Sequence, residues 1–204
     1  MPNAIFNNLP ESKRQRILNA AVKEFAERSL VNANLANIVK DAKIARGSLY
    51  SYFSSKEELY VYIFDTFRAQ RAEYVKPAFE LYRNAPFIDF FSEFYLRDCE
   101  YLMAHPMHIE MGKQLYCAND NTSLGLIRRL QKRYRDWFIV AIEMDKERGI
   151  IDKSVSSSVL TDLCVHFVTD VFIFQNIFDE LSMDNLRQHC DETMHIIRKG
   201  IQAK

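Results

Sequence analysis

Residues 44–60 read IARGSLYSYFSSKEELY, and this stretch decides the fold. Leu49 and Phe53 are four residues apart, so they lie on one face of a short helix. Ser55 and Glu58 have the S-x-x-E spacing of a capping box, in which each residue bonds the backbone N–H of the other. The stretch therefore predicts a short helix followed at once by the start of a longer one.

Two helices are predicted upstream of this stretch. The first runs from Pro10 to about Arg28, and its apolar stripe consists of Ile17, Leu18, Ala21, Val22 and Phe25. The second is capped by Asn34, and its stripe consists of Leu35, Ile38, Val39 and Ala42. Only the residues from Lys43 to Ala45 separate it from the next helix, which is typical of a helix-turn-helix.

The rest of the chain also predicts helices. There are only five Gly and five Pro, and hairpin signals such as Asn-Gly are missing. The helix from residue 55 should kink or end at Pro77, Pro86 and Pro106 suit helix starts, and Arg148-Gly149 suits a helix end. We predict an all-α fold of about nine helices: a three-helix head, residues 1–55, joined by a long helix to a larger helical body, residues 56–204.

The charge is unevenly distributed along the chain. Its formal net charge is zero, but residues 1–56 hold nine Lys or Arg against four Asp or Glu. A basic head on an acidic body favours a polyanion partner for the head alone. Chance scatter of surface charge explains the same count, so the charge leaves both interpretations open.

The sequence also limits the compartment and the chemistry. Cys99, Cys117, Cys164 and Cys190 are widely spaced, which predicts reduced, mostly buried thiols in a cytoplasmic protein. The first residues lack an apolar export segment, and no apolar run approaches the ~18 residues of a membrane span. A phosphate-binding glycine loop, an H-E-x-x-H motif and a nucleophile turn are missing from the sequence, so we expect no enzyme, cofactor or metal.

The second helix of a helix-turn-helix presents its amino-terminal end to the major groove. Here that end carries Arg46, which can bond guanine, and Ser48, which can bond a base edge, while Gly47 allows close backbone approach. Tyr50, Tyr52 and Lys56 can reach phosphates. The alternative is that Tyr50 and Phe53 are core aromatics and that Arg46 and Lys56 are solvated surface charges.

Residues 16–59, RILNAAVKEFAERSLVNANLANIVKDAKIARGSLYSYFSSKEEL, resemble the amino-terminal domain of the TetR/AcrR family of bacterial transcriptional regulators. The resemblance rests on the pattern I-x-x-A-A-x-x-x-F and on G-[ST]-L-Y-x-[YH]-F-x-S-K-E-x-L. It implies contacts to double-stranded DNA from Asn34, Arg46, Gly47, Ser48, Tyr50, Ser51, Tyr52 and Lys56.

Three positions depart from the family pattern. Lys43 stands where members often have Gly in the turn, which costs about 1 kcal/mol if the residue is left-handed. Ala45 stands where Ser is common, so a hydroxyl contact and a helix cap are lost. Ala33-Asn34 replaces a common Thr-Thr pair, although Asn caps a helix at least as well.

The resemblance also implies what the body does. It implies a small-molecule effector, apolar or aromatic, and a homodimer built from the last two helices, residues 154–180 and 183–202. Apolar residues there exceed one core-facing stripe, because Val171, Phe172 and Ile173 adjoin Phe174. The candidate pocket residues are Phe91, Phe94, Tyr95, Tyr101, Met107, Met111, Trp137 and His166. His166 and Gln175 suit either a cavity or a dimer contact, and the spacing of His105 and His108 is a weak metal signal.

The expected function is that of a sequence-specific DNA-binding regulator, a repressor that a small molecule releases from a palindromic operator. Two short recognition helices about 34 to 36 Å apart read such a palindrome in successive major grooves. The alternative is a helical interaction or scaffold protein that does not bind specific DNA. The basic head favours the regulator.

Overall fold

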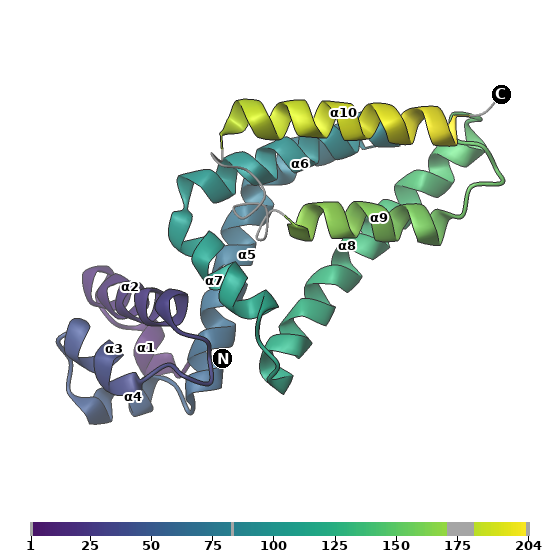
Figure 1. Ribbon diagram of the computed structural model, residues 1–204. Coiled ribbons are helices and arrows are strands. Elements are labelled where there is room, and N and C mark those ends of the chain that lie inside the picture. The colour runs from purple at the N-terminus through teal and green to yellow at the C-terminus, as the bar shows by residue number, and fades with distance from the viewer. Residues whose placement is uncertain (1, 83, 171–181, 203–204) are drawn as a thin grey trace. The chain divides into compact units, whose positions relative to one another are not determined.

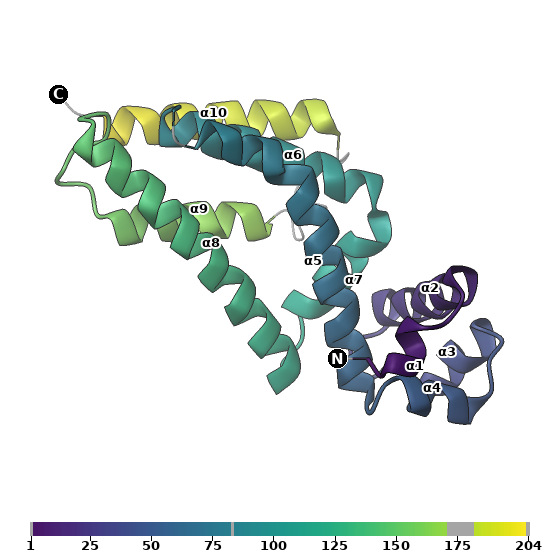
Figure 2. The ribbon, with the colours of Figure 1, turned by 180° about the vertical axis from the view of Figure 1, so that it is seen from behind.

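The computed structural model describes residues 2–82, 84–170 and 182–202. Apart from an isolated backbone bridge between Ile151 and Gln202, these residues form helices and their connections (Figures 1 and 2). The helices are α1 (Ala4–Asn7), α2 (Glu11–Glu27), α3 (Leu35–Asp41), α4 (Arg46–Tyr52), α5 (Lys56–Leu81), α6 (Phe87–Ala104), α7 (Pro106–Tyr116), α8 (Asn121–Glu147), α9 (Ser157–Asp170) and α10 (Met183–Ile201). The all-α prediction is confirmed.

The chain divides into two compact units. The amino-terminal unit consists of Met1–Gln70 and His105–Ile127, and the carboxy-terminal unit of Arg71–Ala104 and Arg128–Lys204. The division falls inside α5 and assigns α7 to the amino-terminal unit. The predicted domains, residues 1–55 and 56–204, remain a proposal about function rather than a description of these units.

The amino-terminal unit is built around one apolar core. The predicted stripes supply it, because Ile17 and Phe25 of α2, Ile38 of α3 and Leu49 of α4 are all at most 2% exposed. From α5 the buried ring of Tyr60 meets Phe25, with ring centroids 4.9 Å apart, and burial raises the pKa of Tyr60 to about 12. The three-helix head thus closes its core against α5, as a segment of this size requires.

Two helices that the sequence did not assign to the head also contribute to this core. Phe6 of α1 is fully buried and lies 4.8 Å, centroid to centroid, from Phe53. From α7, Met111 and Leu115 are buried in the same cluster, and α7 packs on α2. Met111, which was predicted to line an effector pocket of the body, is thus buried in the core of the amino-terminal unit.

The carboxy-terminal unit contains α6 packed along α10 (Figure 1) and a large aromatic cluster. Asp98 of α6 is 1% exposed and accepts two hydrogen bonds from Arg71, through Nε and Nη2. Such a pair is expected for a buried carboxylate, because an unpaired charge in an apolar interior is unstable. Asp145 is also buried and accepts a hydrogen bond of 2.6 Å from the backbone N–H of Phe87, the first residue of α6.

Several predicted helix ends can be compared with the structure. Pro106 is in the first turn of α7, and the helix that ends before Gly149 is α8. The helix that was expected to kink or end at Pro77 does not end there, since α5 continues to Leu81 with Val75 and Ala78 buried. Packing of these neighbours offsets the backbone hydrogen bond that proline removes.

None of the helices in the described ranges combines the length and apolar character that crossing a membrane requires. The four cysteines are free thiols, of which Cys99, Cys164 and Cys190 are buried and Cys117 is exposed. This agrees with the prediction of mostly buried, reduced thiols.

Candidate nucleic-acid interface

The turn between α3 and α4 has the geometry of a Schellman motif. The backbone N–H of Ile44 donates to the Val39 carbonyl at 3.2 Å, and that of Lys43 donates to the Lys40 carbonyl at 3.1 Å. Lys43 has φ 52°, in the left-handed region that this motif requires. Lys43 thus has the left-handed conformation that the sequence comparison considered for this position. Ala45 is the N-cap residue of α4 and provides no side-chain cap.

Helix α4 buries one face and exposes the other. Leu49 is 2% exposed, whereas Arg46, Gly47, Tyr50 and Ser51 are exposed. Tyr50 is 49% exposed, and the Ser51 hydroxyl donates to the Ser48 carbonyl at 2.8 Å. An arginine and a glycine at the exposed amino-terminal end of a helix after a tight turn are what major-groove reading requires.

Tyr52 does not belong to this exposed face. It is 5% exposed, and its ring lies 5.8 Å from that of Phe6. Its three-residue spacing from Leu49 places it on the buried face of α4. This burial does not support the prediction that Tyr52 reaches a phosphate. The alternative of a core aromatic agrees with Phe53, which is 3% exposed, and not with Tyr50.

Lys56 begins α5, and its ammonium group bonds two backbone carbonyls. Its Nζ donates to Val31 O and Ala33 O, both at 3.0 Å. These two bonds fix the segment between α2 and α3, a structural role that the sequence did not indicate. A lysine has three N–H donors, so the predicted phosphate contact and the two carbonyl bonds are compatible.

Asn34 caps α3 as predicted, since its side chain accepts from the backbone N–H of Ala36 at 2.9 Å. The residue that fixes Asn34 was missed by sequence reasoning. Glu24 of α2 is 5% exposed and accepts from the backbone N–H of Asn34 at 2.7 Å and from Asn37 Nδ2 at 3.0 Å. The one signal in the sequence is its position beside Phe25 on the buried side of α2.

The other predicted cap is the box at the start of α5. The backbone N–H of Glu58 donates to Ser55 Oγ at 3.1 Å. The Glu58 carboxylate accepts from the backbone N–H of Ser54 at 2.6 Å, one residue before the expected donor. The box therefore forms in a shifted version, and it still begins the helix where the sequence placed it.

The predicted effector residues do not all lie together. Phe91, Phe94 and Tyr95 are buried in one aromatic cluster, in which the ring of Tyr95 lies 4.5 Å from that of Phe167. Tyr101 is buried beside Tyr74, and Trp137 is half-buried with its ring 4.7 Å from that of Phe79. Met107 and His166 are exposed, and this exposure does not support the pocket role predicted for them.

His105 and His108, the weak metal candidates, stack with ring centroids 5.0 Å apart. Within the described part of the chain, no group of three or more His, Cys, Asp or Glu is arranged to hold a metal ion. His108 also stacks on Phe67.

The surface predicted for dimerisation is described in part. Helix α9 begins at Ser157 rather than at residue 154, because Ser154 lies in a turn in which its backbone N–H donates to Asp152 Oδ1 at 2.8 Å. Val159 and Leu163 of α9 and Ile196 of α10 are 58%, 56% and 71% exposed. Val171, Phe172, Ile173, Phe174 and Gln175 lie outside the described residues.

Comparison with known proteins places this geometry in a family. Residues 17–63 match the family model described as bacterial regulatory proteins, tetR family. YvdT of Bacillus subtilis (strain 168), an uncharacterized HTH-type transcriptional regulator, is 45% identical over 47 residues, which are 23% of this chain and 24% of YvdT. The curated relatives that the chain matches are thus aligned over about a quarter of their length.

Solved structures match over nearly the whole chain. A TetR family transcriptional regulator from Chloroflexus aurantiacus J-10-FL has a TM-score of 0.77 at 17% identity, with both chains covered completely. The transcriptional regulator FadR from Bacillus subtilis, solved in complex with stearoyl-CoA, has a TM-score of 0.72 at 16% identity, covering 88% of this chain and 96% of FadR. At these identities the likeness shows the fold, whereas the amino-terminal motif carries the family. Residues 17–63 of the chain therefore match the tetR family of bacterial regulatory proteins, and the fold of the whole chain is similar to that of a solved TetR family regulator.

Proposed function

We propose that this chain regulates transcription by binding a palindromic operator in double-stranded DNA as a homodimer. The observation that supports the proposal is the exposed amino-terminal end of α4, where Arg46 and Gly47 follow a tight turn. Leu49, on the opposite face of α4, is buried in the core of the unit. Arg46 bonds guanine, Tyr50 and Lys56 bond phosphates, and Asn34 bonds a phosphate from the start of α3.

A dimer supplies the second recognition helix. One short helix covers too few base pairs, and two-fold symmetry of the protein matches a palindromic site. Val159 and Leu163 lie one turn apart on α9 and are more than half exposed, which is the character of a surface that a second copy covers. We assign the dimer contact to this face of α9 and to α10.

The regulator acts as a repressor that a small apolar or aromatic effector releases. The effector binds among the rings of the carboxy-terminal unit, where Phe91, Phe94 and Tyr95 are buried. Among the described residues, the Tyr95 hydroxyl is buried beside the Cys99 thiol, which is a weak hydrogen-bonding group, and it has no stronger partner; burial raises the pKa of Tyr95. Because a buried hydroxyl with only a weak partner is unfavourable, we infer that the effector carries one polar atom that bonds Tyr95.

Selection from random duplex DNA tests the regulator. The expected result is that the unaltered chain enriches a palindrome and that Arg46→Ala loses the preference at one position of each half-site. If no sequence is enriched, the proposal is wrong, and the scaffold alternative that the sequence left open replaces it.

The effector is tested by the melting temperature in the presence of stearoyl-CoA, stearic acid or coenzyme A, chosen because FadR was solved with stearoyl-CoA. An apolar effector raises the melting temperature, since a ligand that binds only the folded state stabilises it. Tyr95→Phe should reduce that shift, and Tyr74→Phe, on an exposed tyrosine, is the control. Equal shifts in both variants would contradict the role of Tyr95.

A further inference from the structure

Two helices of this chain end in the same backbone motif with different residues at the left-handed position. At the end of α8, the backbone N–H of Ile150 donates to Asp145 O at 2.9 Å and that of Gly149 donates to Lys146 O at 3.2 Å, with Gly149 at φ 72°. The end of α3 has the corresponding two bonds, with Lys43 at φ 52°. Glycine adopts this conformation freely, whereas lysine does not.

The difference matters because of where α3 ends. A left-handed residue with a side chain is disfavoured roughly five- to thirtyfold in population relative to a right-handed one. Only residues 42–45 connect α3 to α4. If Lys43 left its left-handed conformation, the start of α4 would move, and Arg46 with it.

Arg16 supplies a bond at this position from another helix. Its Nε–H donates to the carbonyl of Ala42, the last residue before Lys43, at 2.7 Å. Carbonyls at a helix end need partners outside the helix, and a guanidinium is a strong donor because it is charged. The bond joins residues 26 positions apart, so it holds the end of α3 on α2.

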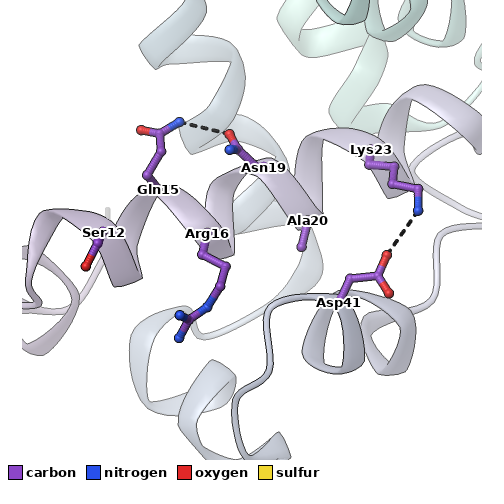
Figure 3. Close-up of a pocket in the computed structure, with 7 residues that line it drawn as sticks. All are labelled: Ser12, Gln15, Arg16, Asn19, Ala20, Lys23 and Asp41. Atoms are coloured by element: carbon purple, nitrogen blue, oxygen red, sulfur yellow. Dashed lines mark hydrogen bonds and ion pairs between the residues drawn. The ribbon is translucent and has the colours of Figure 1, made fainter.

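A pocket between α2 and α3 shows how this attachment is built (Figure 3). Arg16, Ala20 and Lys23 lie on the side of α2 that faces α3, and Lys23 Nζ lies 3.3 Å from Asp41 Oδ2 (Figure 3). The two residues that Arg16 and Lys23 contact, Ala42 and Asp41, immediately precede Lys43. The small side chain of Ala20 leaves the space between the side chains of Arg16 and Lys23 open.

We propose that Arg16 is the positioning residue of the recognition helix: its bond to Ala42 holds the turn in the form that keeps Lys43 left-handed and Arg46 in place. The inference rests on the proposed DNA binding, because the effect of Arg16 is measured as a change in affinity for DNA. Arg16 affects this affinity indirectly, by holding the turn between α3 and α4. If only a fraction of the molecules has the turn in the conformation that binds DNA, the apparent affinity is the intrinsic affinity multiplied by that fraction.

The experiment is a double-mutant cycle between Arg16→Gln and Lys43→Gly. The probe is a duplex selected from random DNA by the unaltered chain, and affinity is measured at a temperature where circular dichroism shows every variant fully folded. R16Q should weaken binding about tenfold, which is the scale on which the left-handed conformation is disfavoured for lysine. In the K43G background the same change should weaken binding less than twofold, because glycine needs no help to stay left-handed.

Two further measurements complete the test. Arg68→Gln removes one exposed positive charge of the same unit, on α5 and away from the turn, and should leave affinity within twofold. The backbone N–H of Ile44 donates to Val39 O, so its hydrogen-exchange rate measures the opening of the turn in the absence of DNA. R16Q should speed that exchange about tenfold in the parent and leave it unchanged in K43G.

An equal loss of affinity in both backgrounds would overturn the inference, since Arg16 would then act by a contact of its own. Unchanged exchange of the Ile44 amide in R16Q would overturn it whatever the DNA result. A chain that selects no duplex while its Ile44 amide responds as expected would contradict the proposed function and leave the role of Arg16 in the turn supported.

Discussion

Glu24 and Asn34 join α2 to the start of α3, the first helix of the helix-turn-helix, through a buried carboxylate. The backbone N–H of Asn34 donates to Glu24 Oε1 at 2.7 Å, and Glu24 itself is 5% exposed. The second carboxylate oxygen accepts from Asn37 Nδ2 at 3.0 Å, and Arg28 Nε lies 3.6 Å from Glu24 Oε1. The start of α3 is therefore fixed by α2, and its end is held by Arg16 and Lys23.

Glu24→Gln should lower the free energy of unfolding by about 1 to 3 kcal/mol. The amide has the shape of the carboxylate but carries an NH2 group, so one of the two N–H donors of α3 loses its acceptor. Urea unfolding measures the change, and Glu27→Gln, on an exposed glutamate of the same helix, should stay within about 0.5 kcal/mol. If the two variants were equally stable, the carboxylate would not be fixing α3.

Lys56→Met should have two separable effects. It removes the bonds to Val31 O and Ala33 O, which should cost about 1 to 3 kcal/mol of unfolding free energy because the donor is charged. It also removes the proposed phosphate contact, which should reduce the slope of log affinity against log salt by about 0.9. Unfolding and a salt titration on the selected duplex measure these effects. An unchanged slope would leave Lys56 a purely structural residue.

Arg46→Ala should relax sequence preference at one operator position in each half-site and cost about 1 to 3 kcal/mol of binding free energy there. The exposure of Arg46 means that its loss should leave folding stability nearly unchanged. Selection repeated with the variant measures the preference, and Arg68→Ala is the charge-matched control. A variant that enriches the same site at parental affinity would show that Arg46 does not read a base.

Gly47→Ala should stabilise the fold and weaken DNA binding at the same time. A Cβ at Gly47 meets nothing within 4 Å, so the gain in helix propensity of about 1 kcal/mol should appear undiminished. The same methyl group occupies the space through which the backbone of α4 approaches DNA. Gly125→Ala on α8 is the control, since its Cβ is equally unhindered and it should stabilise without affecting DNA. Parental affinity in G47A would refute close backbone approach at this position.

The elements that the sequence predicted best are those that local spacing encodes. The stripes of α2 and α3, the cap at Asn34 and the start of α5 all depend on residues within one or two helical turns of each other. The same reasoning was available for Tyr52, whose spacing from Leu49 places it on the buried face, but its hydroxyl group led us to group it with Tyr50 as a phosphate contact. Periodicity was the better guide at that residue.

Contacts between distant segments were not predictable in this way. Met111 and Phe6 belong to the core around Phe25 only because α7 and α1 pack there, and their own spacing says nothing about which core they join. The bond from Arg16 to Ala42 has the same character, since an exposed arginine on an amphipathic helix is usually solvated. The left-handed conformation of Lys43 lies between these cases: the position was identifiable from the sequence, and its partner was not.

The reactivity of the four cysteine thiols tests which of them are buried in the folded protein. Burial raises the pKa of Cys164 and of Cys190 to about 12, and burial together with the Asp98 charge raises that of Cys99 further, whereas Cys117 is exposed. Because the thiolate is the reacting species, a thiol with so high a pKa is almost entirely protonated near neutral pH and reacts slowly. We expect one thiol per chain to react rapidly with a maleimide in the folded protein and all four after unfolding in guanidinium. Cys117→Ser should abolish the rapid phase, and a second rapid thiol in that variant would show that one of the three buried sites opens to solvent.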